Sequence, residues 1–321
     1  MRLAQCADRL GLARYWLAEH HNVPWVAASS PAVLVAMIAG RTTRIRVGAG
    51  GVMLPNHAPL AVAEQFALLE AGYPGRIELG LGRAPGADFV ATQVLRGAVG
   101  RDERDVDRFP DHVDDVVALL GAGGVVVQLG DNPYLLRATP HAVAAPQVYL
   151  LGSSTYSAQL AAAKGLPYVF GHHLFGEGTA EALQRYRAQF VPSEFAAEPQ
   201  AFLTVNAVVA ETRAEAIALA LPGLHALALL ATAEPLGRWQ LVEDAQEAAL
   251  TPAQQRIVDA ELDRAVLGTP AQAATQLHAL ADRFGVDEVM LNPVASARRG
   301  VDPATAPGRE ATLQLLADEL L

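Results

Sequence analysis

Short apolar runs alternate with longer stretches of helical spacing along most of the chain. The strand-like runs end near Ala18, Leu54, Leu81, Leu151, Phe170, Ala210 and Leu291. Each run is followed by a glycine-rich or polar loop, and a helical pattern comes before the next run. This alternation is typical of a parallel α/β sheet, in which functional residues gather at the strand ends.

The chain opens with a helical pattern, Met1 to Gly11, rather than with a strand. Seven strands after a leading helix indicate a (β/α)₈ TIM barrel that lacks its first strand. We predict this fold, as a single domain over residues 1–321. A doubly wound open sheet is the structural alternative, although no G-x-G-x-x-G follows a first strand.

Two stretches depart from the simple alternation. Residues 221–267 are alanine-rich, helical in pattern and weak in strand signals, which predicts a helical insertion before the last strand and a candidate lid over the site. Residues 121–145 contain two short apolar runs between glycines and prolines, and a hairpin is expected there.

Composition limits the classes of partner. The chain has 321 residues and a net charge of −10, so no basic surface is expected for nucleic acid or for an anionic membrane. No apolar run reaches the ~18 residues of a membrane span. The single cysteine, Cys6, allows no internal disulfide. These features favour a cytoplasmic protein.

Histidines follow the first strand. Glu19, His20 and His21 come directly after it, where a barrel places its active site. Because neighbouring side chains on an extended segment point to opposite faces, we expect one of the two rings to face a pocket, as a general base or a ligand contact. A pair of metal ligands would favour His-x-His spacing, so no metal is predicted. The alternative for each histidine is a structural role.

Glycines and an arginine follow the next two strands. Gly50 and Gly51 let a flat ligand approach the backbone, or let the strand kink without a ligand. Arg83 follows a strand that ends in glycine and could bind a phosphate through two hydrogen bonds, or form a surface ion pair.

A second candidate phosphate contact opens a helix. The run Gly152, Ser153, Ser154 and Ser157 brings small residues and hydroxyl groups to a helix start, where backbone N–H groups and the helix dipole favour an anion. The alternative is that Ser154 only caps the helix. His172 and His173 follow another strand and are candidates for a substrate pocket.

These motifs together resemble one family. The strings AEHHN, RIRVGAGGVMLPNHAPL, GRIELGLGRAPGAD, LGSSTYSAQLAA and GLPYVFGHH resemble the bacterial-luciferase-like flavin monooxygenases, in the single-component subgroup with the AEHHN and LGSS motifs. The resemblance implies a TIM barrel, and an enzyme that uses reduced FMN and O₂. The FMN would be supplied by a separate flavin reductase, and a small organic substrate would be oxidised through a flavin hydroperoxide.

The resemblance also implies roles for particular residues. His20 takes the position of the family's active-site histidine near the flavin, and Gly50–Gly51 takes that of a non-proline cis peptide beside the flavin ring. Arg83 matches the phosphate-binding arginine, while Ser154 and Ser157 match hydroxyl residues on the same phosphate. The family's reactive cysteine falls at Gly82, which excludes thiol chemistry there.

The sequence leaves other functional interpretations open. Some branches of the superfamily use a deazaflavin and transfer hydride without oxygen. A non-catalytic flavin-binding relative is a further alternative, because the family's first strand would precede Met1. Either the start lies upstream, or other elements cover the unpaired strands. A metal-dependent hydrolase is the weakest reading. The family commonly forms homodimers through its early helices, and the substrate is not encoded in these motifs.

Overall fold

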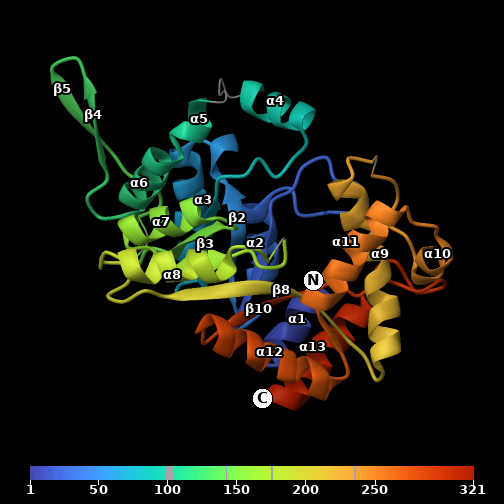
Figure 1. The fold of residues 1–321 in the computed structure, drawn as a ribbon. Coiled ribbons are helices and arrows are strands. Elements are labelled where there is room, and N and C mark those ends of the chain that lie inside the picture. Colours follow the sequence, from blue (N-terminus) through green and yellow to red (C-terminus); the bar gives the residue numbers. More distant parts are fainter. Residues whose placement is uncertain (99–103, 142, 175, 235) are drawn as a thin grey trace. The chain divides into compact units, whose positions relative to one another are not determined.

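The computed structural model describes residues 1–98, 104–141, 143–174, 176–234 and 236–321 (Figure 1). The chain divides into two compact units, neither of which is one continuous stretch. Unit 1 consists of Met1, Gly11–Tyr168 and Arg185–Gln200. Unit 2 consists of Arg2–Leu10, Val169–Gln184 and Ala201–Leu321. The single domain over 1–321 stays a prediction.

Unit 1 is built on a parallel sheet. Its strands follow the order β1 (Arg14–Leu17), β2 (Arg46–Met53), β3 (Ile77–Gly82) and β6 (Gln147–Gly152). The helices of this unit are α2 (Pro31–Ala39), η1 (Leu54–Asn56), α3 (Pro59–Gly72), α4 (Phe89–Ala98), α5 (Arg104–Asp107), α6 (Phe109–Leu120) and α7 (Thr155–Lys164). An antiparallel hairpin joins β4 (Val125–Leu129) to β5 (Asn132–Leu136), as predicted.

Unit 2 has β8 (Ala201–Val209) between β10 (Val289–Pro293) and β9 (Val266–Gly268), both parallel to it. Its helices are α1 (Arg2–Arg9), α9 (Arg213–Ala231), α10 (Val242–Glu247), α11 (Pro252–Arg264), α12 (Pro270–Phe284) and α13 (Pro307–Leu320). Two elements, β7 (Tyr168–Phe170) and α8 (Thr179–Gln189), contribute residues to both units.

The predicted α/β class is confirmed. Each of the seven strands expected from the apolar runs is present, and the helix α1 precedes the first of them. Local chemistry explains several boundaries: Pro59 begins α3, Thr269 forms a capping box at the start of α12, and Gly165 ends α7 with a φ of 62°.

The predicted helical insertion, residues 221–267, needs one correction. Helices do occupy most of it, but its end contains the strand β9, because Val266 and Leu267 are buried and pair with β8. Helix α9 begins before this stretch, at Arg213, and continues through Pro222 to Ala231. The short helices α4, α5 and η1 were also not predicted from the sequence.

Helix α9 is the one helix of the described residues that is long and apolar enough to cross a membrane by length and composition, which the search for apolar runs did not find. Its small side chains instead pack into a core of unit 2. That core is formed by Val208, Ala210, Ala216, Ala220, Leu224, Ala228, Val258, Leu267 and Ala295. The length and hydropathy of α9 therefore have a packing explanation within unit 2.

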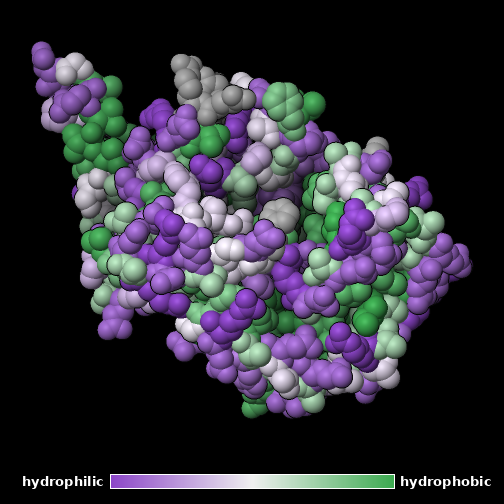
Figure 2. Space-filling model, viewed as in Figure 1, coloured by the Kyte–Doolittle hydropathy of each residue, from purple (hydrophilic) through white to green (hydrophobic). Residues whose placement is uncertain are grey.

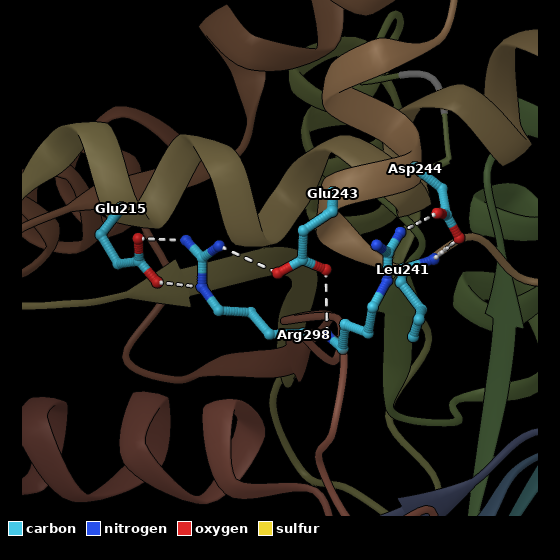
Figure 3. Close-up of polar contacts among 6 residues, drawn as sticks. Glu215, Leu241, Glu243, Asp244 and Arg298 are labelled. Carbon is cyan, nitrogen blue, oxygen red and sulfur yellow. Dashed lines mark hydrogen bonds and ion pairs between the residues drawn. The ribbon is translucent and has the colours of Figure 1, made fainter.

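An ion-pair cluster holds the segment after β10 to α9 and α10 (Figure 3). The Arg298 guanidinium bridges Glu215 of α9, at 2.5 Å, and Glu243 of α10, at 3.4 Å. The neighbouring Arg299 pairs with Asp244 at 3.0 Å. Networks of this kind fix a segment more effectively than a single exposed pair does.

A buried polar cluster lies at the beginning of the strands of unit 1. The Glu78 carboxylate, 1% exposed, accepts hydrogen bonds from Arg14 at 2.9 Å, Trp16 Nε1 at 2.5 Å and the Tyr149 hydroxyl at 3.2 Å. Glu78 is the second residue of β3, so this cluster lies at the end of the sheet opposite to the strand ends discussed below.

Hydrophobic side chains also gather on the surface of the hairpin (Figure 2). Val126, Leu129, Tyr134 and Leu135 are each about half exposed or more, between 47% and 60%. The β4–β5 hairpin projects away from the sheet of unit 1 (Figure 1).

Candidate functional site

The register of unit 1 brings four strand ends to one edge of its sheet. Leu17 of β1 lies opposite Ala49 of β2, and Leu81 of β3 lies opposite Leu150 of β6. The strands are parallel, so the loops that follow them emerge together. These loops, together with the ends of β2 and β6 and the first turn of α7, carry every predicted site residue except His172 and His173.

The two glycines of β2 lie beside this edge. The Gly50–Gly51 peptide bond is cis, as the resemblance implies, and the register of β2 on β3 shifts between Gly50 and Val52. A Cβ atom on Gly50 would come within 2.7 Å of the Trp16 ring, and one on Gly51 within 2.8 Å of the Gly80 carbonyl. Packing alone therefore excludes a side chain here, and a ligand contact remains an additional, predicted reason for the glycines.

A buried carboxylate organises the loops after β1 and β2. The Glu19 side chain is 0% exposed. Its Oε1 accepts hydrogen bonds from His21 Nε2 at 2.9 Å and His57 Nε2 at 2.8 Å, and its Oε2 accepts the Met53 N–H at 2.9 Å. Burial by itself raises the pKa of Glu19, but the hydrogen bonds from His57, His21 and Met53 outweigh it and lower the pKa below its ordinary value. Glu19 is therefore ionised at neutral pH.

His20, the predicted catalytic residue, is exposed at this edge. Loss of hydration against the surrounding protein lowers the pKa of His20, while a hydrogen bond to the Gly86 backbone and the Glu19 charge oppose that effect. The ring is consequently neutral at pH 7 and can accept or donate a proton. His21 points to Glu19 instead, and its backbone N–H donates to the Gly86 carbonyl at 2.8 Å.

The predicted phosphate contacts lie together. The guanidinium of Arg83, in the loop after β3, stacks on the Tyr156 ring of α7 at 4.3 Å. Among the described residues, Arg83 has no ion-pair or hydrogen-bond partner, so its donors are available. Ser154 is the N-cap of α7, yet its side chain makes no capping hydrogen bond. An exposed cation thus faces a helix start whose N–H groups are not satisfied by the cap.

The remaining members of the serine run differ in their surroundings. Ser157 is buried, and its hydroxyl donates to the Ser154 carbonyl at 2.8 Å and meets the Tyr168 hydroxyl at 2.9 Å. A Cβ atom on Gly152 would lie 2.2 Å from the Ser157 Oγ. Gly152 and Ser157 therefore pack against each other inside the helix start, whereas Ser153 and Ser154 are accessible to a ligand. The role of Ser157 in cofactor binding stays a prediction.

The two histidines after β7 belong to unit 2 and point to different partners. His172 is buried, bonds Thr179 Oγ1 at 2.8 Å and packs on Phe284 with ring centres 5.3 Å apart. Burial lowers its pKa to about 4, helped by the charges of Arg264 and Arg283. His173 bonds Thr204 Oγ1 at 2.5 Å.

A hollow of about 670 Å³ within unit 2 is lined by His172 and by residues of α8, α11 and α12. Its lining includes the charged residues Arg264 and Arg283. His172 and His173 both line a smaller void beside it. The assignment of the two histidines to a substrate pocket stays a prediction.

Sequence reasoning missed the contributions of Glu19, His57 and Tyr156. His57 follows the glycine pair of β2 by a few residues, so the rule that directs attention to strand ends could have found it. Tyr156 lies inside the serine run that predicted the phosphate contact. Nothing in the sequence, however, indicates which partner each side chain reaches.

Comparison with known proteins extends these observations. The sequence model of the family described as luciferase-like monooxygenase matches residues 1–288. A luciferase-like monooxygenase of Escherichia coli strain K12 is 37% identical over 290 residues, which cover 90% of this chain and 83% of the relative.

Solved structures resemble the whole chain. The crystal structure of apo-MsnO8 matches with a TM-score of 0.82 and 31% identity, and covers 99% of this chain and 90% of its own. The oxygenating constituent of 3,6-diketocamphane monooxygenase from Pseudomonas putida, in complex with FMN, matches with a TM-score of 0.70 at 17% identity, covering 99% and 91%. An F420-dependent secondary alcohol dehydrogenase matches with a TM-score of 0.69 at 14% identity. The match covers 98% of this chain and 93% of the dehydrogenase chain. At these lower identities the likeness concerns the fold, and it agrees with the predicted barrel class.

Proposed function

Because the chain belongs to the luciferase-like monooxygenase family, we propose that it is a flavin-dependent monooxygenase that uses reduced FMN and O₂ to oxidise a small organic substrate. One observation carries the proposal: the Arg83 guanidinium, which has no hydrogen-bond or ion-pair partner among the residues that the structure describes, lies beside the helix start at Ser154, on the edge that also carries His20. This arrangement suits an anionic, phosphate-bearing cofactor.

The residues fit such a group chemically. A phosphate needs donors, and Arg83 together with the first N–H groups of α7 and the Ser153 and Ser154 hydroxyls can supply them. Stacking on Tyr156 fixes the guanidinium plane while its N–H groups stay free. The chain carries a net charge of −10, yet Arg83 pairs with no carboxylate in the described parts of the chain, which is more consistent with ligand binding than with general solubility.

The other residues would act around the ring. Reduced FMN, when bound, supplies the electrons that activate O₂. Gly50 and Gly51 present backbone without side chains to the ligand. His20 holds or moves a proton at its neutral imidazole, since its lowered pKa keeps it uncharged at pH 7. Substrate contacts from His172 and His173 are part of the same proposal.

The partners follow from this chemistry. A cofactor that must arrive reduced requires a separate flavin reductase, and a cytoplasmic location would supply one. Homodimer formation through the early helices is a further expectation. The substrate class is left open, because pockets in such barrels are formed by variable loops.

A deazaflavin-dependent oxidoreductase is the second candidate. The observation in its favour is the F420-dependent dehydrogenase among the structural matches, whose fold this chain shares at a level comparable to that of the FMN-bound monooxygenase. Such an enzyme would transfer hydride and would need no oxygen. The phosphate contacts described above do not separate the two cofactors.

Equilibrium titration separates the candidates. Oxidised and reduced FMN, and a deazaflavin cofactor in both states, would each be titrated into the protein, with binding followed by flavin fluorescence. Saturable binding of FMN, together with O₂ consumption when reduced FMN is supplied, supports the monooxygenase. Preference for the deazaflavin supports the second candidate, and absence of binding to either favours a non-catalytic relative.

A further inference from the structure

Glu19 makes more contacts than the proposed chemistry requires. Three donors from two loops converge on its buried carboxylate: His21 of its own loop, and Met53 and His57 from the segment after the glycine pair. A buried carboxylate is strongly unfavourable unless its oxygens are satisfied, and here both oxygens are. The cluster is therefore built around a charge.

The charge determines the state of two imidazoles. An ionised carboxylate only accepts hydrogen bonds, so the Nε2 atoms of His21 and His57 must both carry hydrogen. In the neutral rings, Nδ1 is then the proton acceptor. Their side chains remain 18% and 33% exposed. Each ring thus keeps an accessible surface while its tautomer is determined from the buried side.

The same contacts lock neighbouring strand ends. Met53 is the last residue of β2, two positions after Gly51, and its backbone N–H donates to Glu19. The next loop is attached as well, because the His21 N–H donates to the Gly86 carbonyl. Gly86 has a φ of 64°, and a Cβ atom there would lie 2.5 Å from the Glu19 carbonyl. Glu19 thereby joins the segments that carry His20 and the glycine pair, and the backbone of its neighbour His21 holds the loop that carries Arg83.

We propose that Glu19 is a positioning residue of this site, which acts through His21 and His57: it holds both rings as Nε2–H tautomers and fixes the segment after Gly51 against the loop after β1. The consequence for ligand binding rests on the proposed function. The control of the tautomers does not.

The first test determines the tautomers of His21 and His57 directly. Protein labelled with ¹⁵N-histidine would be recorded in long-range ¹H–¹⁵N correlation spectra at neutral pH, with signals assigned through His21→Gln and His57→Gln. Glu19→Gln keeps the volume but replaces one acceptor oxygen by an NH₂ donor. Both rings donate to one carboxylate oxygen and Met53 donates to the other, so the NH₂ group must face either the rings or the Met53 N–H. An NH₂ group against the Met53 N–H would place two donors together, whereas an imidazole can become the Nδ1–H tautomer and accept from it, so the amide oxygen should stay with Met53. We expect at least one of the two rings to change to Nδ1–H in this variant.

Glu78→Gln is the matched control. Glu78 is equally buried and also accepts several hydrogen bonds, but it lies at the other end of β3. Its replacement should destabilise the fold and leave both tautomers unchanged. Unchanged spectra in Glu19→Gln, or the same change in Glu78→Gln, would overturn the inference.

The second test measures ligand affinity. Glu19→Gln should raise the Kd of riboflavin and of FMN by the same factor, about tenfold, or about 1.4 kcal/mol. The two factors should be equal because the variant disturbs contacts to the flavin ring, which both ligands share, and not contacts to the phosphate. Equal affinities in variant and parent would overturn the positioning role. A parent protein that binds neither ligand would overturn the proposed function, whereas unchanged tautomers in a flavin-binding parent would overturn only the present inference.

Discussion

Replacement of Arg83 by alanine tests the proposed anchor most directly. The side chain is exposed, and it stacks on the Tyr156 ring at 4.3 Å, a contact worth about 0.5–1 kcal/mol at an exposed site. The variant should therefore fold. A hydrogen bond from a guanidinium to a charged phosphate contributes about 1.5–3 kcal/mol. The Kd of FMN should then rise about 10- to 150-fold.

The assay uses two ligands that differ in the phosphate alone. FMN and riboflavin would be titrated into parent and Arg83→Ala protein, with quenching of flavin fluorescence as the signal. Riboflavin affinity should be unchanged, because it lacks the group that Arg83 binds. Arg108→Ala, which removes an exposed arginine at the start of α6, is the control for the change in net charge.

Two outcomes would refute the reasoning. If FMN affinity does not change, Arg83 binds no phosphate. If FMN and riboflavin lose affinity equally, the arginine supports the site as a whole and the phosphate role is wrong. The effect should also decrease with added salt, since the site is exposed and the interaction is between charges.

Three further predictions concern other residues. His20→Ala should leave the Kd of FMN within about threefold of the parent value, because His20 does not contact the phosphate. The variant should change the rate at which O₂ reoxidises bound reduced flavin. If the stopped-flow traces of variant and parent superimpose, the catalytic assignment of His20 is wrong. Ser157→Ala should lower the free energy of unfolding by about 1–2 kcal/mol, because the buried Tyr168 hydroxyl loses its nearest partner; urea unfolding with an unchanged midpoint would contradict this. For His172, the folded pKa of about 4 lies below the ordinary value of 6.5, so the unfolded chain binds the proton more tightly between these values. The contribution of neutral His172 to the free energy of unfolding should be fully present above pH 6.5, and should fall by up to about 3 kcal/mol as the pH approaches 4. His172→Gln should lose this part of the pH dependence, and a parallel decline in both proteins would argue against it.

The strand–helix alternation was readable from the sequence because it depends on local rules. Apolar runs such as Gln147–Gly152 become buried strands, and caps such as Thr269 and Gly165 mark where helices begin and end. Strand β9 was missed because its three residues follow a stretch of helical pattern with no strand signal of their own, and only pairing with β8 selects the strand conformation. Helix α9 likewise passes through Pro222, where local preference alone predicts an end.

The sequence by itself determined which residue types stand at the strand ends: two histidines after β1, two glycines in β2, an arginine after β3 and serines before α7. Only the tertiary structure decided what each side chain does there. Glu19 and His57 are 38 positions apart, and Arg83 and Tyr156 are still farther, yet each pair is in contact. Parallel pairing sets the register that brings such distant residues together, and no local pattern carries that information.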